Sequence, residues 1–142
     1  MNKTLIVAVA AAAIAGAAYV ATRGPAPEEA AAPAEGEAMV AITLPDTLSP
    51  EAAIGQRAFD ATCADCHGAH ATGRMGFGPP LVHKIYEPGH HADMSFYLAV
   101  QNGVRAHHLR FGDMPAQTGL TRADVAGIVA YVRELQRANG IE

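Results

Sequence analysis

Cysteine is scarce in this sequence of 142 residues, and clusters of positive charge are absent from it. The chain has only two cysteines, and both lie in the pentapeptide CADCH at residues 63–67. Lysine and arginine are dispersed and the formal net charge is -4, so no basic stripe is available to bind phosphates. We therefore expect no nucleic acid partner. No segment sustains the alternation of apolar and polar residues that a strand would show, which favours an all-α fold.

The amino-terminal residues 1–23 have the pattern of an export signal. Lys3 precedes an uncharged run over 4–22, and the triplet AGA at 15–17 is a small-x-small cleavage site. If it is not cleaved, the same run is long enough to serve as a membrane anchor. In either case the rest of the chain is exported to an oxidising compartment. We predict that it works on the periplasmic side of the bacterial inner membrane, anchored there or soluble in the periplasm.

Residues 24–49 are predicted to form a flexible acidic linker. The stretch GPAPEEAAAPAEGEA at 24–38 is rich in Ala, Pro and Glu and contains no large apolar residue, so it cannot bury enough surface to fold. Repulsion between its carboxylates extends such a chain. A linker of this length has little purpose behind a cleaved signal. Its length therefore favours a membrane anchor through residues 4–22.

Residues 50–142 are predicted to form one all-α domain. A helix should begin at Pro50 after Ser49, because serine is a favourable N-cap and proline a favourable first residue. A short helix is expected over 93–102, and a last helix opens with the capping-box sequence TRAD at 121–124. The apolar residues of the last helix recur at helical spacing: Val125, Ile128, Val129, Val132 and Leu135. The loops between these helices are long for so small a domain, so we expect them to enclose a large apolar group.

Some side chains of the two shorter helices are expected to face the core. On the first helix these are Ile54, Ala58 and Phe59. On the second helix Phe96, Tyr97 and Val100 are expected to point inward, and Met94 at the start of that helix is interpreted as core filler.

Three chemistries compete for CADCH: a dithiol redox pair, half of a zinc site, and the covalent attachment of a haem. A dithiol pair normally lies in a thioredoxin-like fold, and the sequence has no strand pattern for one. Zinc would need two further ligands, and the adjacent pairs His90-His91 and His107-His108 chelate poorly because neighbouring side chains diverge. The pattern C-x-x-C-H is specific for c-type haem, since the thiols add to the two vinyl groups and the imidazole reaches the iron. We therefore favour haem.

From Pro50 to Ile141 the chain resembles the class I cytochromes c, with the family's motifs in the family's order. The matching residues are Gly55, Phe59, Cys63, Cys66, His67, Gly78, Pro79, Leu81, Met114, Pro115 and Tyr131. The resemblance implies an all-α fold in which three to four helices and ordered loops wrap around one covalently bound haem c. It also implies that Gly55, Phe59 and Tyr131 pack where the first and last helices cross.

Two features depart from the family pattern. The stretch VHKIYEPGHHADM at 82–94 has no counterpart that we can assign. The ring of lysines that mitochondrial members present around the haem edge is missing, because Lys84 is the only lysine after the linker. Inferences about partners that rest on that ring do not transfer to this chain.

The predicted haem site has five residues. Cys63 and Cys66 would form the thioether bonds, and His67 would bind the iron through Nε2. An acceptor at Nδ1 of such a histidine sets its tautomer and strengthens the ligand. By resemblance that acceptor is the backbone carbonyl of Pro79. Met114 is favoured as the second axial ligand, because it lies far downstream in a Gly- and Pro-bounded loop.

Other residues compete with Met114 for the iron. Met75 lies too close to the CADCH motif to reach the other haem face easily, and Met39 is in the linker. His107 and His108 are interpreted as a solvated pair on the surface, and so are the remaining histidines outside the motif: His70, His83, His90 and His91.

These observations predict a mono-haem electron carrier that is not an enzyme. Its donor would be a quinol-oxidising complex or a dehydrogenase, and its acceptor an oxidase or a reductase, in a respiratory or photosynthetic chain. One alternative is a haem protein whose sixth coordination position opens, as in a small-molecule sensor or a peroxidase. The other alternative is an electron-entry subunit fixed in one enzyme complex.

Overall fold

The computed structural model describes residues 32–107 and 111–142. The chain divides into two units, Met1–Ala32 and Pro33–Glu142, and every element below belongs to the second. The predicted export segment, the start of the predicted linker and His108 lie outside the described residues. The elements, in chain order, are α2 (Pro50–Thr62), α3 (Ala64–His67), η1 (Ala69–Ala71), η2 (Lys84–Tyr86), α4 (Asp93–Asn102) and α5 (Arg122–Ala138).

The described part of the chain is all-α, as the sequence predicted. Within residues 32–107 and 111–142, the β-type pairing consists of isolated bridges outside any named strand. In the same part of the chain, no helix is both long and apolar enough to cross a membrane.

The two longest helices begin at the caps that the sequence predicted. The Ser49 hydroxyl accepts a hydrogen bond from the amide of Ala52 at 3.2 Å and so caps α2. At the start of α5, the Thr121 hydroxyl accepts from the amide of Asp124, and the Asp124 carboxylate accepts from the amide of Thr121 at 2.8 Å. This reciprocal pair is a complete capping box.

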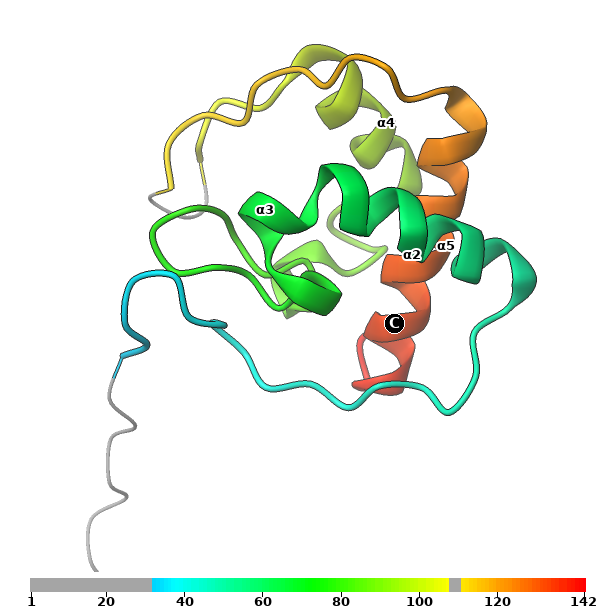
Figure 1. Ribbon diagram of the computed structural model, residues 1–142, viewed down its shortest axis with the longest axis horizontal. Helices are drawn as coiled ribbons and strands as arrows, with labels where there is room; N and C mark the ends of the chain where they lie inside the picture. Colours follow the sequence, from blue (N-terminus) through cyan, green and yellow to red (C-terminus); the bar gives the residue numbers. More distant parts are fainter. Residues whose placement is uncertain (1–31, 108–110) are drawn as a thin grey trace, which may run out of the picture. The chain divides into compact units, whose positions relative to one another are not determined.

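Helices α2 and α5 cross at a pair of glycines, Gly55 and Gly127 (Figure 1). A Cβ atom on Gly55 would overlap the carbonyl group of Gly127, so the backbones touch directly at this point. Next to the crossing, the rings of Phe59 and Tyr131 pack edge to face, with centroids 5.7 Å apart and planes at 61°. The predicted packing role of Gly55, Phe59 and Tyr131 is confirmed, and Gly127 is a partner that the sequence analysis missed.

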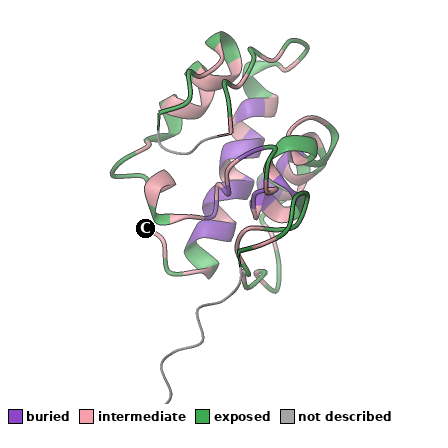
Figure 2. Cartoon of the chain, turned by 90° about the vertical axis from the view of Figure 1, so that its left-hand side faces the viewer, coloured by how far each residue is buried: buried purple, intermediate pink, exposed green. Residues whose placement is uncertain are grey.

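Most of the core residues belong to α5, which Figure 2 shows as the most continuously buried helix. Helix α2 covers it with Ala52, Gly55 and Phe59, whose spacing of three and four residues puts them on one face. Two of the predicted core positions are wrong. Ile54 is 56% exposed because it precedes Gly55 by one residue and so points about 100° away from that face. Met94 is 49% exposed at the start of α4 and does not fill the core.

Residues 33–49, which we call the N-terminal strap, run along the folded domain before α2 begins (Figure 1, cyan). Ile42 and Leu48 pack against the core, and the amide of Gly36 donates to the carbonyl of Met75 at 2.8 Å. This part of the chain therefore differs from the predicted flexible linker over 24–49. Several of its contacts are made by backbone groups, which composition does not reveal.

The segment 82–94, for which no counterpart could be assigned, is held by two buried polar side chains of α5. Arg133 donates to the carbonyls of Tyr86 (2.7 Å) and His91 and to the carboxylate of Asp93 (2.8 Å). Gln136 is fully buried and donates to the Tyr86 carbonyl at 3.0 Å. The segment therefore lies against α5 and forms part of the cavity wall described below.

Candidate haem-binding site

A cavity of about 520 Å³ lies among α2, α3, α4, α5 and the loops that connect them. Most of its wall is apolar. The apolar side chains on it include Phe59, Leu81, Phe96, Val100, Val104 and Ile128. A cavity of this size and lining suits a large, mostly apolar ligand.

The CADCH motif forms the turn where α2 ends and α3 begins. The amide of Cys63 still donates to the carbonyl of Phe59 at 2.7 Å, and α3 is a single turn that ends at His67. Cys63 and Cys66 are three residues apart in helical geometry, so their thiols share one face. Both thiols and the imidazole of His67 line the cavity. Burial and the nearby Cys66 raise the pKa of the Cys63 thiol to about 11.

His67 is oriented by a backbone acceptor. Its Nδ1 atom lies 2.9 Å from the carbonyl oxygen of Pro79, which can only accept, so Nδ1 carries the proton and Nε2 has a free lone pair. This is the contact that the family resemblance implied. Burial lowers the pKa of His67, against the opposing effect of the bond to Pro79. The ring is thus kept neutral, which is the form that binds a metal ion.

Gly78 allows the Pro79 carbonyl to approach this closely. A Cβ atom at Gly78 would lie 2.6 Å from the carbonyl oxygen of Cys66. The loop that carries Pro79 therefore packs directly on the backbone of the CADCH turn, and any larger residue at this position would push it away.

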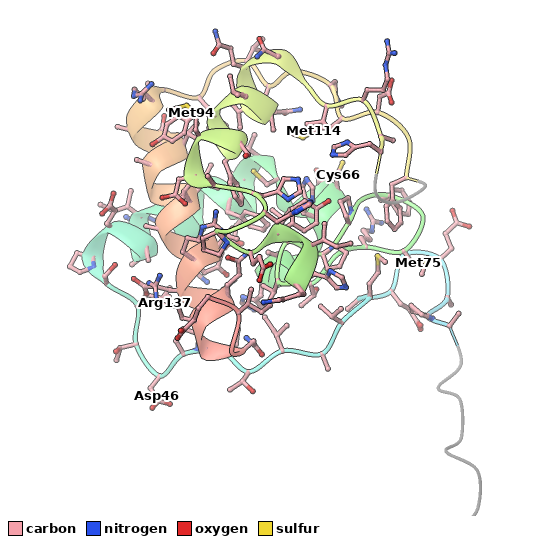
Figure 3. All side chains as sticks on the ribbon, turned by 180° about the vertical axis from the view of Figure 1, so that it is seen from behind. Asp46, Cys66, Met75, Met94, Met114 and Arg137 are labelled. Atoms are coloured by element: carbon pink, nitrogen blue, oxygen red, sulfur yellow. The ribbon has the colours of Figure 1, made fainter. Side chains whose placement is uncertain are left out.

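Met114 lines the same cavity, although it lies 47 residues after His67 in the loop that follows α4. Its backbone pairs with Val104, with both N–H···O distances at 2.9 Å, and this fixes the start of the loop that follows α4. Gly103 makes the pairing possible, because a Cβ atom there would lie 2.5 Å from the Met114 carbonyl. Figure 3 labels Met114 and Cys66, and both side chains line the cavity.

The other predicted or competing methionines lie elsewhere. Met94 lies apart from Met114 and Cys66 (Figure 3) and is not among the residues that line the cavity. Met75 is half-buried in the loop after α3, where its backbone pairs with the N-terminal strap. The Met39 sulfur lies beside Gly73, on the strap.

Three histidines that we predicted to be solvated at the surface are instead half-buried and bonded. The Nδ1 atom of His70 lies 3.0 Å from the hydroxyl of Tyr131, and His83 caps η2 by accepting from the amide of Ile85. His91 donates from Nδ1 to the carbonyl of Ile85 at 2.7 Å and lines the cavity. His107 is exposed but also lines the cavity, while His90 is exposed as predicted.

The grouping of these residues fits haem better than zinc. Within residues 32–107 and 111–142, no three His, Cys, Asp or Glu side chains come together as a metal site. Two thiols and a neutral imidazole on one turn of an apolar cavity match covalent attachment of a haem and ligation of its iron.

The comparisons with known proteins agree with this chemistry. Residues 52–136 match the family model described as cytochrome c. The chain is also 35% identical over 85 residues to cytochrome c-555 of Chlorobaculum thiosulfatiphilum, a match that covers 58% of this chain and 93% of that protein. This chain belongs to the cytochrome c family. Membership implies one covalently bound haem c, a role as an electron carrier, and redox proteins as partners.

Proposed function

We propose that this protein carries single electrons between redox proteins on the periplasmic side of the bacterial inner membrane. The donor would be a quinol-oxidising complex or a dehydrogenase, and the acceptor an oxidase or a reductase. Cys63 and Cys66 would attach haem c covalently, and His67 and Met114 would bind its iron. The haem would supply the one-electron redox chemistry.

The observation that carries this proposal is the presence of His67 and Met114 on the walls of one apolar cavity. His67 comes from the turn after α2, and Met114 from the loop after α4. Two protein ligands would close the iron to small molecules and leave electron transfer as its function. A thioether sulfur favours Fe(II) more than a second imidazole does, so we expect a comparatively high reduction potential.

The Pro79 carbonyl acts on the other predicted iron ligand, His67. By accepting the Nδ1 proton of His67 at 2.9 Å, it holds the ring in one orientation and makes Nε2 a stronger donor. It would therefore partly offset the preference for Fe(II) that Met114 supplies.

The ligand assignment can be tested with Met114→Ala, using Met94→Ala as the matched control. Met94 is half exposed and does not line the cavity. Met114→Ala should keep its covalent haem, lose the weak far-red band of methionine coordination in the ferric protein, bind CO when ferrous, and show a lower potential. Met94→Ala should behave as the wild type. A low-spin Met114→Ala protein that binds no CO would refute the assignment, and a wild type that binds CO readily would favour a sensor.

We also propose that residues 4–22 anchor the protein in the membrane. The flexible tether would be shorter than the sequence predicted, because the contacts of the N-terminal strap with the domain start near Gly36. The part of the predicted linker before the strap, residues 24–32, would have an r.m.s. span of roughly 17 Å if flexible. Such a tether would keep the haem domain near membrane complexes and raise its effective concentration there. Haem-stained protein in the membrane fraction would support the anchor, and an amino terminus at Ala18 in a periplasmic wash would refute it.

A further inference from the structure

The N-terminal strap lies outside the residues that match the family, which begin at 52. It nevertheless makes a ladder of backbone contacts with the loop after α3. The amide of Met75 donates to the carbonyl of Glu37 at 2.9 Å, and the amide of Gly36 donates back to the Met75 carbonyl. Met39 and Val40 both donate to the Thr72 carbonyl at 3.2 Å. The strap thus pairs with the loop along residues 72–75.

The other end of the strap is fixed to α5 and to the core. Thr43 and Asn139 exchange two hydrogen bonds, at 2.8 Å from the Thr43 amide and at 2.9 Å to its carbonyl. Leu48 packs against the core, and the Ser49 amide donates to the Glu134 carboxylate at 3.1 Å. The strap is therefore attached at both ends, and residues 36–40 are held against the loop by their own hydrogen bonds to it.

The paired loop is the one that carries the acceptor of His67. Arg74 and Gly78 exchange backbone hydrogen bonds of 2.9 and 3.0 Å, and Pro79 follows Gly78 directly. The Gly73 amide donates to the His67 carbonyl at 2.7 Å. Gly73 lets Pro80 and the Met39 sulfur of the strap come close together, because a Cβ atom there would lie 2.6 Å from the Pro80 nitrogen and 3.0 Å from that sulfur. The strap is thus connected to the Pro79 carbonyl in two steps. It bonds to residues 72–75, and the reciprocal pair between Arg74 and Gly78 joins that stretch to the residue before Pro79.

We propose that the N-terminal strap is a positioning element for the axial ligand His67. By holding residues 72–75, it keeps the Pro79 carbonyl in line with the Nδ1 proton of His67 and so maintains the basicity of the iron ligand. This inference rests on the proposed role of His67, but not on the identity of the second axial ligand.

The strap can be released at its centre by Met39→Pro in the full-length holoprotein. Proline removes the amide that donates to Thr72 as well as the sulfur beside Gly73. Met39→Leu keeps the amide and an apolar side chain and serves as the conservative variant. Asn139→Ala breaks the attachment of the strap to α5, far from the loop, and controls for a general loss of stability.

Two readouts report on His67: solvent exchange of its Nδ1 proton in the reduced protein, followed by NMR, and the midpoint potential. Met39→Pro should speed the exchange at least about tenfold. It should also raise the potential, because a weaker hydrogen bond makes His67 a poorer donor to Fe(III). Met39→Leu should keep the exchange rate and the midpoint potential of the wild type. Asn139→Ala should lower the melting temperature but leave the exchange rate and the potential unchanged.

A second variant keeps the proposal testable if Met39→Pro yields little holoprotein. Gly36 has φ of +84° and open space around it, so Gly36→Ala strains the turn that pairs with Met75 without a steric clash. It should move both readouts in the same direction by a smaller amount. Wild-type exchange and potential in both variants would overturn the proposal. The CO-binding test of Met114 is independent of this result, so failure of the strap and failure of the ligand assignment are distinguishable.

Discussion

Replacing Gly55 with alanine tests whether the backbone contact between α2 and α5 holds the domain together. Gly55 lies in the middle of α2, where alanine has the higher helix propensity by about 1 kcal/mol. Propensity alone therefore predicts a more stable protein. The structure predicts the opposite, because the added Cβ would overlap the Gly127 carbonyl and lie 2.7 Å from the amide nitrogen of Ile128.

The expected cost follows from which atoms are in the way. Overpacking a core commonly costs about 1 to 3 kcal/mol when side chains can adjust. At Gly55 the obstacle is backbone of α5, so we expect a cost at the upper end of that range. After the gain in propensity is subtracted, Gly55→Ala should lose about 2 kcal/mol of unfolding free energy. For a domain of this size the melting temperature should fall by roughly 8 to 16 °C.

Gly89→Ala is the matched control for this experiment. Gly89 has no heavy atom within 4 Å of the added Cβ, and its φ is not in the left-handed region. The control should stay within about 0.5 kcal/mol of the wild type. Thermal and guanidinium unfolding of the two holoproteins, followed by circular dichroism, measures the difference. A Gly55→Ala protein as stable as the Gly89→Ala protein would refute the close backbone contact.

Two further predictions concern α5. Arg133→Met should lower the free energy of unfolding by about 2 to 4 kcal/mol, because the His91 carbonyl and the Gln136 side chain lose their charged donor. Denaturant titration measures this loss, with Arg137→Met on the exposed side of the helix as the control. Equal stabilities of the two variants would contradict the prediction. The hydrogen bonds from Thr121 hold the pKa of Asp124 below its usual range, so this carboxylate stabilises the fold above its unfolded pKa and ceases to do so as the pH falls through the lowered value. Asp124→Ala should therefore melt below the wild type at neutral pH and level with it in strong acid, whereas a gap that persists in strong acid would argue against the capping box.

Local sequence signals correctly predicted the three longest helices, α2, α4 and α5, but not the short elements α3, η1 and η2. Ser49 and Pro50 marked the start of α2, and the pattern TRAD marked the start of α5, because caps satisfy helix-end groups with side chains a few residues away. The CADCH motif likewise predicted haem, since one helical turn is enough to bring both thiols and the imidazole to one face. Each of these inferences needed only short-range geometry.

Burial on the shorter helices could not be predicted in the same way. Ile54 and Met94 are apolar residues in helices, and the sequence suggested core positions for both. Which side of α2 faces α5 was decided by the one place where the backbones can touch, at Gly55 and Gly127. That choice depends on two residues 72 positions apart in the sequence.

The sequence by itself determined the three longest helices, the haem attachment motif and the family. Only the tertiary structure decided where the N-terminal strap and the segment 82–94 lie and which groups bind them. The strap reads as linker because its contacts with the loop after α3 are backbone hydrogen bonds, which any composition can make. The segment 82–94 has its place because Arg133 and Gln136, polar residues on a helix, are buried against its carbonyl groups. Long-range partners of this kind are chosen by the folded arrangement, and no local pattern in the chain records them.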